Sequence, residues 1–83
     1  MNRMIHLSKE EIVMGFVATC VEEVAAKLDL DYLEVFEQME QTHLIDDYIV
    51  RHYATLHAES RKAIVEDLIE LLHQRLHQSP WIS

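Results

Sequence analysis

Apolar residues recur at helical spacing in four segments of the chain, and the first of these segments is the longest. It covers residues 9–28, and its apolar positions are Ile12, Val13, Phe16, Val17, Cys20, Val21, Val24 and Leu28. These positions follow the 3.6-residue period of an α-helix. Ser8 and Glu11 have the spacing of a capping box, in which each side chain bonds the backbone N–H of the other residue. The pattern therefore predicts an amphipathic helix that begins at about Lys9.

The second segment, residues 32–41, begins with the same spacing of capping residues. Asp31 takes the capping position, and Glu34 follows three residues later. The side chains expected to face inward are Val35, Phe36 and Met39. A short helix over about 32–41 is therefore predicted.

Two more helices are predicted in the second half of the chain. The first follows a weak break at residues 42–43 and covers about 44–57. Its inward positions are Leu44, Ile45, Tyr48, Ile49, His52, Tyr53 and Leu56. Ser60 is the next capping residue, and it begins a helix over about 61–77. Pro80 prevents this last helix from continuing.

These four helices with short connections predict an all-α, compact helical bundle. The β-branched residues lie in helical patterns, so strands are not expected. The chain has 83 residues, of which 49% are hydrophobic, which suits one domain over 1–83 with a real core and with tails at 1–7 and 79–83. It contains one glycine and one proline, so it has no glycine-rich loop that could bind phosphate or a dinucleotide.

Charge gives the strongest indication of a partner. The formal net charge is −8, and residues 29–40 hold five acids and no base: Asp29, Asp31, Glu34, Glu37 and Glu40. Asp31 and Glu34 suit the start of a helix, whereas Glu40 lies near the helix end, where the dipole disfavours negative charge. We expect Glu34, Glu37 and Glu40 to bind a basic protein surface, and we expect no nucleic-acid partner. The alternative is an ordinary solvated face.

The cellular setting is predicted from the single cysteine and from the absence of long apolar runs. Cys20 is the only cysteine, so the chain can form neither an internal disulfide nor a CxxC zinc site. No apolar run approaches the roughly 18–20 residues of a membrane span. We therefore expect a soluble cytoplasmic protein that needs neither a membrane nor a cofactor. Cys20 lies on an apolar stripe, where a thiol is usually an inert packing group.

Six histidines raise the question of metal binding. His73 and His77 are four residues apart on the last helix and are weak candidates for metal ligands. Arg75 between them argues against a bound cation, and histidines near a helix end also suit the dipole. His52 is expected to pack at the edge of the core, and His57 to bond terminal carbonyls of the third helix.

Self-association is a second hypothesis. Gly15 costs stability in the middle of a helix, and its face continues through the small residues Ala18 and Thr19. Close approach of another helix, from the same chain or from a second copy, would explain this glycine. Trp81 in the tail after Pro80 is exposed unless it docks on an apolar surface. These four positions, Gly15, Ala18, Thr19 and Trp81, are the candidates for a homodimer contact.

Two blocks of residues resemble a known family. The blocks are Ile45-Asp46-Asp47-Tyr48-Ile49 with His52-Tyr53 and Leu56-His57, and Ile64-Val65-Glu66-Asp67-Leu68. They look like a group of short bacterial domains catalogued as domain of unknown function 3791, and the resemblance spans roughly residues 11–72. It implies a small helical protein. It also implies an antitoxin or adaptor role, because some members are encoded near toxins that resemble ADP-ribosyltransferases.

The sequence thus predicts a small acidic helical interaction module and not an enzyme. Its predicted mechanism is charge-steered docking onto a basic protein, with neighbouring apolar contacts supplying affinity. The alternatives are a structural homodimer without a separate ligand and, least favoured, a metal-binding protein that uses His73 and His77.

Overall fold

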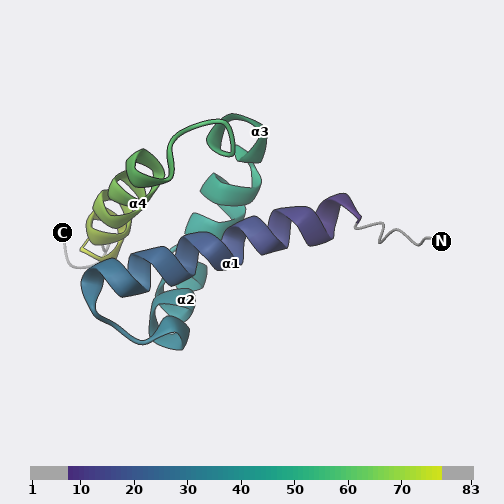
Figure 1. The fold of residues 1–83 in the computed structure, drawn as a ribbon. Coiled ribbons are helices and arrows are strands. Elements are labelled where there is room, and N and C mark those ends of the chain that lie inside the picture. Colours follow the sequence, from purple (N-terminus) through teal and green to yellow (C-terminus); the bar gives the residue numbers. More distant parts are fainter. Residues whose placement is uncertain (1–7, 78–83) are drawn as a thin grey trace.

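The computed structural model describes residues 8–77, and the elements in that range are all helical. In chain order they are α1 (Lys9–Leu28), α2 (Tyr32–Gln41), the π-helix η1 (Leu44–Val50), α3 (Tyr53–Leu56) and α4 (Arg61–Leu76). The long helix α1 crosses the molecule and contacts α2, η1 and α4, which pack around it (Figure 1). The all-α fold predicted from the sequence is confirmed.

Local hydrogen bonds define both ends of α1. Ser8 Oγ accepts a bond from the Glu11 backbone N–H at 3.1 Å, and Glu11 Oε1 accepts one from the Ser8 N–H at 2.9 Å. This is the predicted capping box. At the other end, Asp29 adopts a left-handed conformation with φ 59°. The N–H groups of Asp29 and Leu30 then bond the carbonyls of Ala26 and Ala25, which is the Schellman arrangement that ends a helix.

The other two capping predictions have different outcomes. Ser60 Oγ accepts a bond from the Ala63 N–H at 3.2 Å and begins α4 as predicted. Asp31 caps α2 by accepting from the Leu33 N–H at 3.1 Å. Among the described residues, however, Glu34 returns no bond to Asp31, so the predicted second capping box does not form. The Glu34 carboxylate is left exposed to solvent.

The third predicted helix, over 44–57, is divided in the structure. Its first part is η1, a π-helix that follows His43 in a left-handed conformation with φ 64°. Its second part is the single turn of α3, and α4 then ends at Leu76 rather than at His77. A π turn holds more residues than an α turn, so it brings Leu44 and Ile49 onto the buried side together. The expectation that His52 packs at the core edge is wrong, because His52 is exposed while Leu56 is buried.

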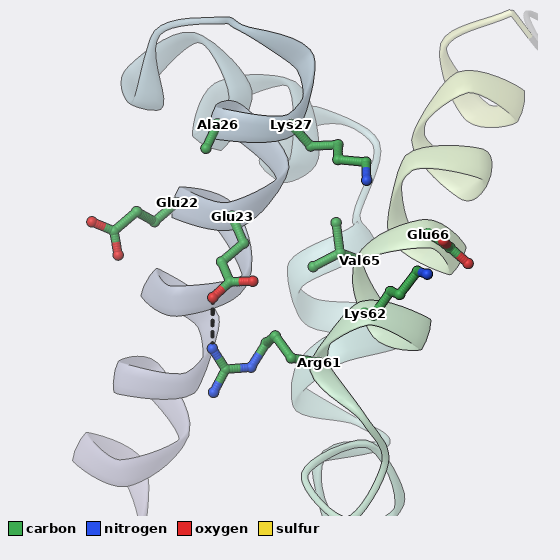
Figure 2. Close-up of a pocket in the computed structure, with 8 residues that line it drawn as sticks. All are labelled: Glu22, Glu23, Ala26, Lys27, Arg61, Lys62, Val65 and Glu66. Carbon is green, nitrogen blue, oxygen red and sulfur yellow. Dashed lines mark hydrogen bonds and ion pairs between the residues drawn. The ribbon is translucent and has the colours of Figure 1, made fainter.

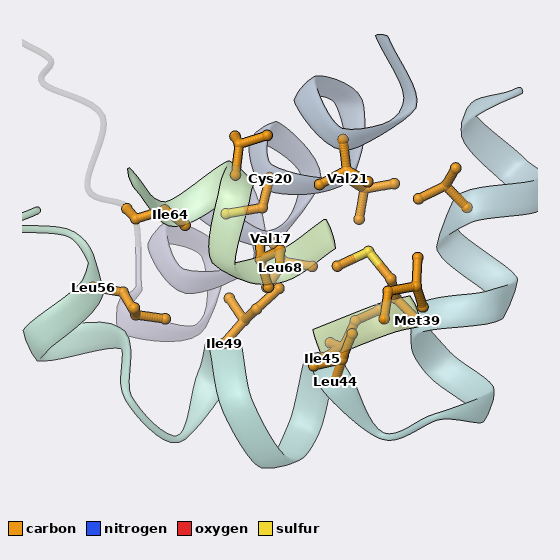
Figure 3. Close-up of a cluster of buried hydrophobic side chains, with 14 of the residues drawn as sticks. Val17, Cys20, Val21, Met39, Leu44, Ile45, Ile49, Leu56, Ile64 and Leu68 are labelled. Atoms are coloured by element: carbon orange, nitrogen blue, oxygen red, sulfur yellow. The ribbon is translucent and has the colours of Figure 1, made fainter. Parts of the chain in front are cut away.

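One hydrophobic core lies between α1, α2, η1 and α4 (Figure 3). Its most deeply buried side chains are Val17, Cys20, Val21, Val24, Val35, Met39, Leu44, Ile49, Ile64 and Leu68. Phe16 and Tyr53 close one side of it with an edge-to-face ring contact at 5.3 Å. Within residues 8–77 no polar or charged side chain is buried. Polar chemistry is therefore confined to the surface.

Candidate functional site

Helix α2 presents the three carboxylates that the sequence predicts as a binding surface. Glu34, Glu37 and Glu40 are all exposed. Val35 and Met39 on the opposite side of the helix are fully buried. The apolar side therefore fixes α2 to the core and directs the carboxylates to solvent. We call Glu34, Glu37 and Glu40 the acidic strip.

The acidic strip has no nearby cation on its own helix. The α2 sequence contains no Lys or Arg, and its last turn, where Glu40 lies, carries no base. In the part of the chain that the structure describes, one ion pair forms, between Arg61 and Glu23 at 2.7 Å, and it does not involve α2. No ion pair among the described residues therefore neutralises the strip, although Arg75 of α4 reaches the end of α2, where its Nη1 donates to the Thr42 carbonyl at 3.0 Å.

Apolar side chains border the strip, and the sequence prediction missed the most prominent of them. Leu33 is 64% exposed, more than any other large hydrophobic side chain that the structure describes. It lies four and seven residues before Glu37 and Glu40, so the three share one face of α2. This spacing could have revealed Leu33 from the sequence, because the residue interrupts the polar face. Leu30, in the connection from α1, and Tyr32, at the start of α2, are also exposed, and the Tyr32 ring stacks on Phe36 with centroids 6.3 Å apart.

A groove of about 690 Å³ runs between α1 and α4 (Figure 2), and no residue of the acidic strip lines it. Its two apolar lining residues are Ala26 and Val65, and the other side chains along it are charged. The Arg61–Glu23 ion pair crosses it at one end. Three acids and three bases line the groove, so their formal charges cancel. The groove therefore has no net charge with which to select a charged ligand.

Comparison with known protein families identifies the domain. The profile of the family described as "Protein of unknown function (DUF3791)" matches residues 15–75, which is most of the chain. The chain belongs to this family. The resemblance of the two sequence blocks is thereby confirmed. No curated protein and no solved structure matches the chain.

The first of the two sequence blocks, residues 45–57, forms most of η1 and all of α3 in the DUF3791 domain. Tyr48 is half-buried, and its pKa is raised first by burial and then by the negative charges of Asp67 and Glu59. The His52 ring lies beside it, with ring centroids 5.7 Å apart. A raised pKa keeps the Tyr48 hydroxyl protonated, which makes it a poor nucleophile. This group therefore gives no sign of an activated catalytic centre.

Three further histidines of the DUF3791 domain, His57, His73 and His77, lie at helix ends. His57 Nδ1 lies 3.2 Å from the carbonyls of both Tyr53 and Ala54, which confirms the predicted role at a helix end. The rings of His73 and His77 are 4.4 Å apart and exposed. Between residues 8 and 77, no three His, Cys, Asp or Glu side chains lie close enough together to hold a metal ion.

Cys20 is fully buried in the core of the DUF3791 domain. Burial raises the pKa of its thiol to about 11, an effect that nearby Arg61 reduces and Glu23 increases. The thiolate is the reactive form of cysteine, so this thiol is inert near neutral pH.

Three of the four candidate self-association residues, Gly15, Ala18 and Thr19, lie on α1. Gly15 and Ala18 are exposed, and a Cβ atom added at Gly15 would meet no atom within 4 Å. Close approach of a helix from the same chain therefore does not explain this glycine. Thr19 is half-buried, and its hydroxyl donates to the Gly15 carbonyl at 3.0 Å. Trp81 lies outside the described residues.

None of the described helices of the DUF3791 domain combines the length and the apolar character that crossing a bilayer requires.

Proposed function

We propose that this DUF3791 domain is a cytoplasmic protein-interaction module that docks a basic protein surface through α2. The observation that carries the proposal is the exposure of Glu34, Glu37 and Glu40 beside Leu33 on one helix that has no cation of its own. Charged residues that attract without local neutralisation steer association. An exposed leucine among them supplies apolar area that water disfavours.

The charged and the apolar side chains of this surface have different roles in binding. The carboxylates accept hydrogen bonds from Lys or Arg of the partner and raise the rate of encounter. Leu33, with Leu30 and Tyr32 beside it, enters an apolar recess and slows dissociation. The partner surface is therefore expected to be basic around an apolar pocket. An antitoxin-like inhibitor or an adaptor would use such a surface.

A binding role is favoured over a catalytic one by the state of the potential nucleophiles. The pKa values of Cys20 and Tyr48 are both raised, so neither side chain is activated. The acidic strip also lies on the exposed side of a single helix, and its residues line neither the groove between α1 and α4 nor the groove between α1 and η1, whereas active sites are usually concave.

The test begins with the partner that co-purifies with the untagged protein from its native host. The triple variant Glu34→Gln, Glu37→Gln and Glu40→Gln keeps the shape of the strip and removes its charge. We expect its association rate with that partner to fall by about tenfold at low ionic strength, and the salt dependence to flatten. Stopped-flow kinetics over a range of salt concentrations measures both effects.

The matched control replaces three other exposed acids, Glu59→Gln, Glu66→Gln and Glu70→Gln. It changes the net charge by the same amount but leaves α2 intact. The proposal requires a clearly smaller effect from this control than from the strip variant. Equal association rates for the wild type and the strip variant would remove α2 from the interaction.

A further inference from the structure

A second groove lies at the open end of the hydrophobic core, where the first two turns of α1 run beside η1 and α3. It has a volume of about 630 Å³, many times the share of one water molecule. Its floor is apolar and is formed by Val13, Met14, Val50, Tyr53 and Ala54. Val13 is buried and belongs to the core, so the groove continues the core outward.

The apolar side chains of this groove remain partly in water in the isolated chain. Met14 is 49% exposed and Val50 is 39% exposed. Ile12, on the same turns of α1, is also exposed. Exposed apolar residues that gather beside a hollow mark a surface suited to a protein contact. The α1–α4 groove lacks this property, because charged side chains dominate its lining.

The rim of the groove carries both signs of charge in equal number. Lys9 and Arg51 contribute two positive charges, and Glu10 and Asp46 contribute two negative ones. The chain as a whole has a formal charge of −8, so most of its surface repels a second copy. At this apolar groove, however, the two positive and two negative charges of the rim sum to zero, so the groove itself adds nothing to the repulsion.

We propose that the groove is the contact face of a homodimer, in which the first two turns of α1 from each copy lie in the groove of the other. A two-fold axis makes such a face self-complementary, because every contact occurs twice. Met14 of each copy then enters the partner's groove beside Val50. A rim with two bases and two acids allows each cation to face an acid of the second copy.

The salt dependence of this contact distinguishes it from the binding proposed for α2. Docking of the acidic strip onto a basic protein weakens as salt screens the attraction. Two copies that each carry a charge of −8 repel one another, so salt should strengthen their apolar contact. The dimer does not depend on the acidic strip, and the two proposals can fail separately.

Sedimentation equilibrium of the full chain tests the dimer. We expect a reversible monomer–dimer equilibrium that shifts towards the dimer as ionic strength rises. Met14→Glu should raise the dissociation constant by about tenfold or more, because it places a charge at the centre of an apolar contact. Circular dichroism should show an unchanged fold, since Met14 is half exposed in the monomer.

Leu33→Glu is the matched control, because it also replaces an exposed apolar residue on a helix with a glutamate. It lies outside the groove and should leave the dissociation constant within about twofold of the wild type. A wild type that stays monomeric at high micromolar concentration overturns the proposal. So does an equal effect of the two variants.

Cross-linking gives a second measurement. Chains with Met14→Cys are mixed with chains that carry Val50→Cys, and the mixture is oxidised. The proposed packing predicts that a disulfide forms between the two kinds of chain. It should form faster than in a control mixture of Met14→Cys chains with chains that carry Ala63→Cys, an exposed position on α4. Equal rates for these two mixtures would contradict the packing of α1 in the groove.

Discussion

Gly15 lowers the stability of α1, and the structure of the single chain gives no reason for a glycine at this position. It lies in the middle of α1, where glycine lowers helix stability relative to alanine. Open space surrounds the position, and the backbone there is ordinary helix with no positive φ. Among residues 8–77, therefore, no contact requires the missing side chain.

Gly15→Ala should raise the free energy of unfolding by about 0.5–1 kcal/mol, because alanine restricts the unfolded chain and favours the helix. Urea denaturation at low protein concentration measures the change. Ala18→Gly, one turn later on the same exposed face, is the control and should lower stability by a similar amount. A loss of stability in Gly15→Ala would show that the position is crowded after all.

At the level of elements, the sequence predicts those features that depend on neighbouring residues alone, such as the starts of helices. The starts of α1, α2 and α4 were predicted because Ser8, Asp31 and Ser60 bond backbone N–H groups within their own first turn. The same reasoning also predicted a bond from Glu34 to the backbone of Asp31, and this bond does not form among the described residues. The three-residue spacing allows such a bond but does not hold the Glu34 side chain in place to make it. The acidic strip was predictable because charge and helical period determine which side chains face solvent.

The division of residues 44–57 was not predictable in this way. An apolar pattern at i, i+1, i+4 and i+5 suits both an α turn and a π turn, and packing against α1 and α2 decides between them. The left-handed residue that begins η1 is a histidine, so no glycine marks the break. The two grooves were also beyond the sequence, because each joins elements far apart in the chain.

His43→Gly should stabilise the protein by roughly 0.5–1 kcal/mol, because the steric cost of a left-handed conformation for a residue with a Cβ atom exceeds the entropy that glycine loses on folding. The His43 side chain is exposed and caps nothing, so little is lost with it. Thermal and urea denaturation measure the gain. His52→Gly is the control, because His52 has φ −107° and glycine there should only destabilise. Equal effects of the two substitutions would contradict this account.

For the molecule as a whole, the most general feature is a core whose only titratable side chain, among residues 8–77, is the Cys20 thiol. Hydrophobic burial holds this core together without internal polar bonds to specify its packing. The domain therefore resists changes of pH in the acidic and neutral range better than a core with buried carboxylates would. Its sensitive range lies on the alkaline side.

Burial raises the pKa of Cys20 from 9.0 to about 11, so the folded protein holds the thiol proton more tightly than the unfolded chain. The resulting stability is fully present below pH 9.0 and is lost as the pH rises through about 11. We expect the unfolding free energy to fall across this window more steeply in the wild type than in Cys20→Ala. Urea denaturation at a series of pH values measures both curves, and parallel curves would contradict the prediction.

The π-helix η1 has a consequence for how this domain can vary in length. Inserting one residue into an α-helix turns everything that follows by about 100°, which would carry an apolar stripe away from the core. A π turn takes up one additional residue and absorbs that rotation. Leu44 and Ile49 before the turn at residues 51–52, and Leu56 after it, all remain buried. We therefore expect deletion of one residue within η1 to be tolerated better than a deletion within α1, because η1 can then tighten into an α turn and keep its apolar side chains on the core.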